Sequence, residues 1–202
     1  MARIKLGAAI AIFFAAGLAF ALGLGQQAPD FKATDWKGKN IELSQFQGRQ
    51  NVLLVFSRYI GCAWCQMFII DLSKKQAEIA ATNTRVLIVA NSEPEVVKEY
   101  KPPKDFSFDL VPDRSLKLYE LYNIKMENTK MTGNVFWQTV RFVKYLGDYN
   151  WVDRGLEGDH YQPPACFIIG KDGKIKYLHV GKDVADNPKT DEIIKELKKL
   201  KD

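Results

Sequence analysis

Apolar runs alternate with amphipathic stretches along most of the chain. Asn51 to Phe56 and Arg85 to Ala90 are largely apolar and rich in β-branched residues, which is typical of strands buried on both faces. Ala165 to Ile169 is a third such run. Cys65 to Ala81 contains no Gly or Pro, and its apolar residues recur at helical spacing. Pro188 to Lys201 has the pattern of an amphipathic C-terminal helix.

Turn residues predict two hairpins. Phe31 to Leu43 contains two short extended runs around a turn at Trp36 to Lys39. Asp172 and Gly173 form a D-G turn between the third apolar run and Lys174 to Val180. The first hairpin precedes the first long strand, and the second lies directly before the C-terminal helix.

Short elements are expected between the second and third apolar runs. Pro94 suits the first turn of a short helix. Phe108 to Val111 is predicted to be a brief strand, and Asp113 is predicted to cap a helix that runs to Tyr122.

This order of elements predicts an α/β fold, with a mixed and mostly parallel central sheet flanked by helices on both faces. Residues of about 125–160 form an insertion in this plan, and Val135 to Leu146 within it is expected to be helical. We expect the aromatic residues of the insertion to cover a sheet edge and pack internally. The alternative is a lid or a partner surface beside the cysteines. These aromatic residues are Phe136, Trp137, Phe142, Tyr145, Tyr149 and Trp151.

The N-terminus has the pattern of an export signal. Met1 to Lys5 is short and basic, Leu6 to Leu24 carries no charge, and Ala19 to Ala21 is an A-x-A cleavage pattern. This predicts a signal peptide over residues 1–21, or an uncleaved membrane anchor that extends to about residue 24. Residues 22–29 would then be a linker and residues 30–202 the domain. The domain is expected to be exported, to the periplasm or outside the cell, free or tethered to the inner membrane.

Composition narrows the class of protein. The chain has 202 residues, of which 47% are hydrophobic and 26% charged, which suits one globular domain with a full core. The formal net charge is +5, but the basic residues are spread along the chain apart from the terminal KELKKLKD. We therefore expect no nucleic-acid partner. Three cysteines are too few for a disulfide framework, and in an exported domain a C-x-x-C pair indicates working chemistry.

Two of the cysteines, Cys62 and Cys65, form a C-x-x-C pair where a buried strand gives way to a helix. Free N–H groups and the positive end of the helix dipole favour a thiolate at such a place. We expect Cys62 to be the more exposed thiol, and Cys65 to be buried and able to attack a mixed disulfide on Cys62. Arg58 near a thiolate would lower its pKa; the alternative is a solvated loop arginine.

Other uses of the pair stay open. Haem attachment is excluded because Gln66, and not His, follows the second cysteine. A structural disulfide would close too small a loop to add much stability. Copper or zinc would need further ligands, which Cys166, His160 and His179 could supply. Cys166 is expected to be a small buried core residue. The alternative to an enzyme is therefore a non-enzymatic metal carrier.

Five stretches carry a resemblance to a known family: APDF (28–31), GKNIELSQF (38–46), LLVFSRYIGCAWC (53–65), LVPDRSLKLYELYNI (110–124) and QPPACFIIGKDGKIKYLHVGKDVADNP (162–188). Residues 27–200 resemble the thioredoxin-fold redoxins, in particular the peroxiredoxin-like branch of the alkyl hydroperoxide reductase/thiol-specific antioxidant (AhpC/TSA) family. The resemblance implies a thioredoxin-like fold and a thiol-dependent oxidoreductase. Its Cys62/Cys65 dithiol would reduce a peroxide or a protein disulfide. A thiol reductant protein is implied as partner, with no cofactor and no metal.

The chain departs from the peroxiredoxin motif P-x-x-x-T-x-x-C, whose cysteine attacks peroxide. Alignment on Phe56 puts Cys65 at that cysteine, Arg58 at the proline and Cys62 at the threonine. The hydroxyl that orients peroxide is therefore missing from its usual place. Arg58 or Arg114 would supply the positive charge of such a site.

A second departure lies before the third apolar run. Peroxiredoxins place an arginine there, whereas this chain has Pro164. Thioredoxins have a cis-proline at this place, facing their C-x-x-C pair. The resemblance thus implies a cis bond before Pro164 and a backbone edge that can pair with a substrate peptide beside the sulfurs. Together the two departures favour dithiol–disulfide exchange over fast peroxide reduction, and both activities stay open.

Overall fold

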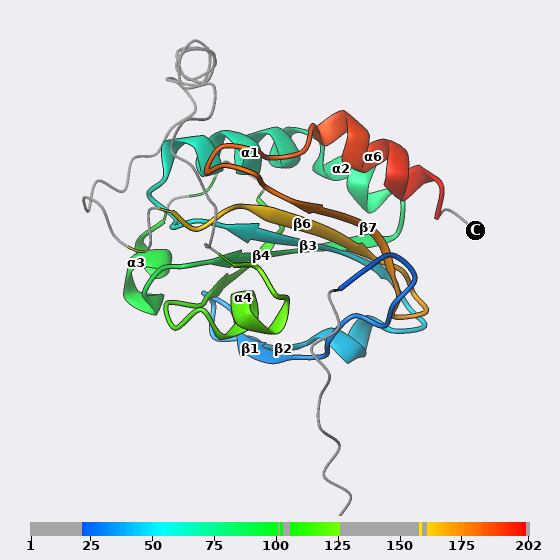
Figure 1. Ribbon diagram of the computed structural model, residues 1–202, viewed down its shortest axis with the longest axis horizontal. Helices are drawn as coiled ribbons and strands as arrows, with labels where there is room; N and C mark the ends of the chain where they lie inside the picture. Colours follow the sequence, from blue (N-terminus) through cyan, green and yellow to red (C-terminus); the bar gives the residue numbers. More distant parts are fainter. Residues whose placement is uncertain (1–21, 101, 103–105, 126–157, 159–160, 201–202) are drawn as a thin grey trace, which may run out of the picture.

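A mixed sheet of five strands in the order β5-β4-β3-β6-β7 forms the centre of the computed structural model, which describes residues 22–100, 102, 106–125, 158 and 161–200 (Figure 1). Strands β3, β4 and β5 are parallel, whereas β6 runs antiparallel to β3 and β7 antiparallel to β6. The predicted α/β class and the antiparallel C-terminal pair are confirmed. The strands are β3 Asn51–Ser57, β4 Thr84–Ala90, β5 Asp109–Pro112, β6 Ala165–Ile169 and β7 Ile175–Val180.

The central strand β3 contributes to two hydrophobic cores, because successive side chains of a strand point to opposite faces. Leu53 and Val55 lie in the core on one face, and Leu54 and Phe56 lie in the core on the other. Figure 1 shows α1, α2 and α6 over the first face, and α4 with the N-terminal hairpin over the second. The helices are α1 Ala63–Lys74, α2 Gln76–Ala80, α3 Pro94–Glu99, α4 Lys117–Leu121 and α6 Thr190–Lys198.

Two predicted helices have different bounds in the structure. The stretch expected as one helix from Cys65 to Ala81 is two helices, because Lys75 leaves helical geometry with φ −111° and ψ 13°. Helix α4 starts later than predicted, because Leu116 adopts the left-handed conformation with φ 60°. Asp113 still acts as its cap, since its carboxylate accepts hydrogen bonds from the N–H groups of Lys117 and Leu118.

The N-terminal hairpin forms as predicted. It pairs β1 Lys32–Thr34 with β2 Asn40–Glu42, and the 3-10 helix η1 Leu43–Phe46 follows. The Asp35 carboxylate closes the turn by accepting from the N–H groups of Lys37 at 2.9 Å and Lys39 at 2.7 Å.

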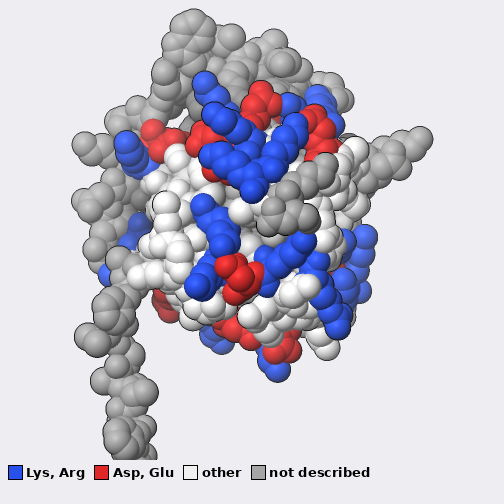
Figure 2. Space-filling view, turned by 90° about the vertical axis from the view of Figure 1, so that its right-hand side faces the viewer, with Lys and Arg blue, Asp and Glu red and all other residues white. Residues whose placement is uncertain are grey.

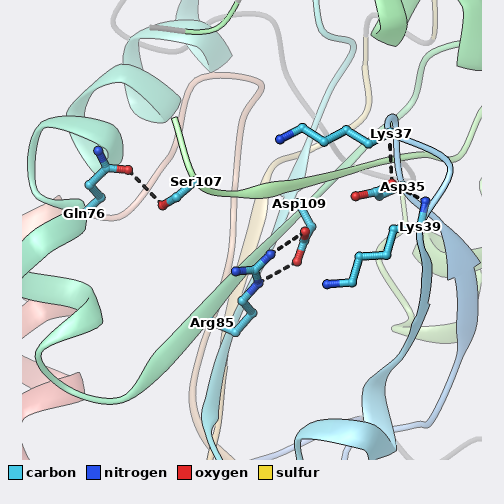
Figure 3. A network of polar contacts seen from close by, with 7 residues as sticks. All are labelled: Asp35, Lys37, Lys39, Gln76, Arg85, Ser107 and Asp109. Atoms are coloured by element: carbon cyan, nitrogen blue, oxygen red, sulfur yellow. Dashed lines mark hydrogen bonds and ion pairs between the residues drawn. The ribbon is translucent and has the colours of Figure 1, made fainter. Parts of the chain in front are cut away.

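Beside this turn, Arg85 of β4 donates two hydrogen bonds of 2.6 Å to the carboxylate of Asp109 in β5 (Figure 3). Arg85 lies near the start of its strand, so this ion pair is at the opposite end of the sheet from the C-x-x-C pair. It joins the edge strand β5 to its neighbour β4.

Residues 22–29, which we expected to be a linker, are docked on the domain. The N–H of Gly25 donates to the carbonyl of Ile175, and the N–H of Ala28 donates to the carbonyl of Gly173. Ala28 is buried in the core with β3 and β6. This stretch therefore lies against the β6–β7 hairpin.

Basic and acidic side chains are interleaved on the face that Figure 2 presents (Figure 2). Ion pairs on the surface of the domain join Lys75 with Asp191, Lys176 with Asp172, Lys198 with Glu78 and Lys199 with Glu196.

Some predicted segments fall outside the described residues. The signal or anchor over residues 1–21, His160 and nearly all of the insertion over 125–160 are among them. Within the described part of the chain, no helix has the length and apolar character needed to cross a membrane.

Candidate active site

The cysteine pair lies at the carboxyl end of β3, as predicted. The strand ends at Ser57, and the loop from Arg58 to Gly61 leads into Cys62, which is the N-cap of α1. Cys65 lies in the first turn of this helix. The sequence folds this way because the apolar run ends at Ser57 and Ala63 starts a stretch without helix-breaking residues.

Hydrogen bonds fasten the loop between Ser57 and Cys62 to its surroundings. The carbonyl of Arg58 accepts from the N–H of Asn91 at 2.6 Å. The N–H of Ile60 donates to the hydroxyl of Ser92 at 2.9 Å, and its carbonyl accepts from the side-chain amide of Gln66 at 2.8 Å. The loop is thus tied both to the end of β4 and to α1, which fixes the position of the two sulfurs.

Both thiols are buried. Cys62 and Cys65 are each 2% exposed, so the prediction that Cys62 is the more exposed thiol is wrong. The reason is that Tyr59 and Trp64 pack around the pair. All cysteines are in the free thiol form.

Arg58 is the charged partner of the pair. Its Nη2 donates a hydrogen bond of 2.9 Å to Cys62 Sγ, and the Cys65 N–H donates to the same sulfur at 3.4 Å. The guanidinium lies 5.5 Å from the ring centres of both Tyr59 and Trp64, a distance that suits cation–π contacts. At 4% exposure Arg58 is a buried residue and not a solvated loop arginine.

The surroundings of the two thiols shift their pKa values in opposite directions. Burial acts to raise the pKa of Cys65, but the hydrogen bond from Cys62 and the charge of Arg58 overcome it and lower that pKa to about 6. Burial and the neighbouring Cys65 raise the pKa of Cys62 well above its usual value, although Arg58 bonds directly to its sulfur. The two thiols therefore act as one dithiol, in which Cys65 gives up its proton near pH 6 and Cys62 keeps its own.

Cys166 lies apart from this dithiol. It belongs to the core on the α1 face, whereas Cys62 and Cys65 form a separate cluster with Tyr59. Burial raises its pKa well above the usual range. The predicted core role of Cys166 is confirmed.

Of the predicted extra metal ligands, Cys166 and His179 do not join the pair, and His160 lies outside the described residues. His179 is the register partner of Cys166 on β7, and its Nε2 lies 2.9 Å from the Asp186 carbonyl. Among the described residues, no cluster of at least three His, Cys, Asp or Glu side chains could hold a metal ion.

Pro164 lies at the same end of the sheet as the dithiol, because the next residue, Ala165, pairs with Phe56 of β3. The described residues contain no cis peptide bond, so the predicted cis-proline is wrong. The trans form is the default by about 0.5–1 kcal/mol for a bond before proline. Pro164 is further held by its carbonyl, which accepts from the N–H of Gly181 at 2.8 Å and so continues the pairing of β6 with β7.

Sequence reasoning missed three residues that build this site. The carbonyl of Ser57 accepts a hydrogen bond from the buried Tyr119 hydroxyl, which also donates to the Val89 carbonyl. Asn91 holds the Arg58 carbonyl, as described above. Ser57 had a signal in the sequence, since it is the first polar residue after the apolar run of β3. No local pattern pointed to Tyr119 or Asn91, because only the fold brings α4 and the end of β4 to the cysteine loop.

A model of the AhpC/TSA family matches residues 24–178. The chain belongs to this family. Among its relatives, prostamide/prostaglandin F synthase of Danio rerio is 27% identical over 162 residues, which cover 79% of this chain and 80% of that protein. Peroxiredoxin Bcp of Escherichia coli is 24% identical over 157 residues, which cover 78% and 85%. The predicted family is therefore confirmed.

Solved structures confirm the thioredoxin-like fold. The crystal structure of peroxidoxin BcpB from Mycobacterium tuberculosis superposes with a TM-score of 0.65 at 15% identity and covers 90% of this chain and 99% of that one. Family membership and relatives of this kind identify the chain as a thiol-dependent oxidoreductase. Its cysteine pair lies at the carboxyl end of β3.

Proposed function

We propose that the protein reduces hydroperoxides, with Cys65 as the attacking thiolate and Cys62 as the thiol that resolves the product. The observation that carries this proposal is the buried Arg58 guanidinium, which donates a hydrogen bond to Cys62 Sγ and whose charge helps to lower the pKa of Cys65 to about 6. A thiolate at neutral pH next to a fixed positive charge is the arrangement that nucleophilic attack on an O–O bond needs.

The steps balance within the dithiol. The Cys65 thiolate bonds to one peroxide oxygen, the O–O bond breaks, and the leaving oxygen takes a proton, which yields an alcohol or water and a sulfenic acid. The Cys62 sulfur then attacks the Cys65 sulfur, a disulfide forms, and water leaves. A thiol reductant protein returns two electrons and reopens the disulfide. Arg58 first stabilises the Cys65 thiolate and then the negative charge that develops on the leaving oxygen.

Burial of the site favours a small oxidant over a protein disulfide. Pro163 and Pro164, which border the cysteine loop, are buried and have no N–H to offer a peptide. The Pro164 carbonyl already accepts from Gly181, and the Pro163 carbonyl accepts from the side chain of Gln162 at 3.4 Å. A peptide would therefore find few main-chain partners beside the sulfurs, whereas a hydroperoxide needs none.

Thiol–disulfide exchange is the second candidate, and one observation favours it. Cys62 is the N-cap of α1, and its sulfur accepts from the N–H of Cys65, which is the position of a nucleophilic sulfur at a helix N-terminus. In this case Cys62 would attack a protein disulfide, and Cys65 would release the mixed disulfide.

Thiol counting separates the two candidates. The fully reduced protein is mixed with one equivalent of hydrogen peroxide or of an oxidised thioredoxin-type protein, the reaction is quenched with acid at intervals, and the free thiols of this protein are titrated after it has been separated from its partner. Hydroperoxide reduction predicts rapid loss of two thiols per peroxide and formation of a Cys62–Cys65 disulfide, found by peptide mapping. Rapid thiol loss with the protein disulfide and slow loss with peroxide would favour exchange instead.

We further propose that this enzyme works outside the cytoplasm. The support is the N-terminal pattern of a basic start, an uncharged stretch and Ala19 to Ala21, which suits a signal over residues 1–21 or an uncleaved anchor. Cell fractionation with N-terminal sequencing tests this. A mature protein that begins at Leu22 in the periplasm or medium supports cleavage, an intact N-terminus in the membrane fraction supports the anchor, and an intact protein in the cytosol contradicts export.

A further inference from the structure

Ser57 places a buried hydroxyl on the side of the sheet that α1 covers. Ser57 is the last residue of β3 and is 4% exposed. Alternation along the strand puts its side chain on the same face as Leu53 and Val55, which pack in the core on the α1 side. Cys65 lies in the first turn of α1. The hydroxyl is therefore directed to the helix turn that carries the thiolate.

The backbone of Ser57 is fixed on both sides. The Ser57 carbonyl accepts a hydrogen bond from Tyr119 of α4, and the residue pairs with Ala90 of β4. The next residue is Arg58, which is fixed by the N–H of Asn91 and by Cys62 Sγ.

The Ser57 hydroxyl has no hydrogen bond of ordinary geometry among the described residues. It nevertheless lies close enough to the Cys65 sulfur to help lower the pKa of that thiol. Asn91 Nδ2, at the end of the neighbouring strand, is likewise buried and has no acceptor in the described part of the chain. Buried donors without a full partner are unfavourable in a resting protein, and such groups are expected where a reacting atom will arrive.

We propose that the Ser57 hydroxyl stabilises the reacting group on Cys65 by a hydrogen bond throughout the reaction. It donates a hydrogen bond to the thiolate in the reduced enzyme, and it then hydrogen-bonds the oxygen that the sulfur takes from the hydroperoxide. Ser57 itself neither gains nor loses a proton overall. The second half of this inference rests on the proposed peroxide reduction, whereas the first half concerns the thiolate alone.

The test compares Ser57→Ala with the wild type, with Ser57→Thr as the variant that keeps a hydroxyl. Ser73→Ala is the matched control, because Ser73 is another buried serine whose hydroxyl donates to the Ile69 carbonyl farther along α1. Far-UV circular dichroism and thermal unfolding show whether each variant folds. Two quantities are measured: the pKa of the reactive thiol, from the pH dependence of iodoacetamide alkylation, and the rate constant with hydrogen peroxide at a pH where the thiolate is fully formed.

Ser57→Ala is expected to raise the thiol pKa by about one unit and to slow the reaction with peroxide roughly tenfold or more at full ionisation. Ser57→Thr should recover most of both losses, and Ser73→Ala should change neither. An unchanged thiol pKa and rate in Ser57→Ala would overturn the proposal. If the rate with peroxide falls only in proportion to the thiolate fraction, the proposed hydrogen bond from Ser57 to the transferred oxygen would be rejected.

Failure of the proposed function gives a different pattern. If the wild type reacts with peroxide no faster than free cysteine, peroxide reduction and the contact with oxygen are both rejected. The thiol pKa of Ser57→Ala, measured by alkylation, then still decides whether the hydroxyl donates a hydrogen bond to the thiolate.

Discussion

Arg58 Nη2 donates a hydrogen bond of 2.9 Å to Cys62 Sγ inside a site from which solvent is almost excluded. The cation therefore comes from the same loop as the dithiol, four residues before Cys62. Because both partners are fixed by backbone hydrogen bonds of the loop, the charge is in place before any substrate arrives.

Replacement of Arg58 should make the thiols less acidic. In Arg58→Met the charge and the hydrogen bond are lost, and we expect the pKa of the reactive thiol to rise by about one to two units. Arg58→Lys keeps the charge without the planar guanidinium and should give a smaller rise. Alkylation rates measured across pH check this.

Arg114→Met is the matched control for that experiment. Arg114 is partly exposed and pairs with Glu93 and the Asn91 side chain, not with a sulfur. A rise of the thiol pKa in Arg114→Met equal to that in Arg58→Met would show that general positive charge, and not the Arg58 contact, sets the acidity.

The rate of oxidation should depend on pH with a single rise on the acid side. The Cys65 pKa lies below its usual value, at about 6, so the thiolate fraction grows as pH rises through 6 and is nearly complete at neutral pH. The rate constant with hydrogen peroxide is therefore expected to increase between about pH 5 and pH 7 and then to level off. A rate that keeps rising up to pH 9 would mean that the attacking thiol has an ordinary pKa.

Replacement of each cysteine by serine should distinguish the attacking thiol from the resolving thiol by the oxidation product that forms. Cys62→Ser keeps the attacking sulfur, so peroxide should convert it to a sulfenic acid that dimedone labels at Cys65. Cys65→Ser should show no rapid oxidation and no label. Mass spectrometry of the labelled peptides checks this, and a label on Cys62 in Cys65→Ser at the wild-type rate would reverse the roles.

A variant far from the dithiol should lower stability without changing the chemistry. Asp109 is nearly buried and accepts both hydrogen bonds from Arg85, so Asp109→Asn weakens a charged pair at the other end of the sheet. We expect a loss of about 1–3 kcal/mol in the free energy of unfolding by urea. The rate with peroxide should stay unchanged. Lys32→Gln, which removes an exposed pair with Glu42, should have no measurable effect on either quantity.

The sequence contained enough to predict the fold because its signals are local. Runs of buried β-branched residues marked β3, β4 and β6, and the D-G turn at Asp172 marked the last hairpin. The break at Lys75 and the left-handed Leu116 were not predictable, since each depends on how a helix end packs. The cis-proline was implied by the resemblance alone, and the described residues contain no cis peptide bond.

The site was predicted in part. Cys62, Cys65 and Arg58 are close together because they lie within one loop and one helical turn, which sequence spacing describes well. Burial of Cys62 was missed, because it depends on the side chains of Tyr59 and Trp64 folding over the pair. Ser57 and Tyr119 were missed because their contact joins residues 62 positions apart in the chain.

The central claim is tested most directly by stopped-flow oxidation of the reduced protein with hydrogen peroxide, followed by tryptophan fluorescence, since Trp64 lies beside Arg58 and the dithiol. The account predicts a rate constant far above that of a free thiol, lost in Cys65→Ser and kept for the first step in Cys62→Ser. Slow oxidation by peroxide, with fast exchange against a protein disulfide that requires Cys62, would contradict it.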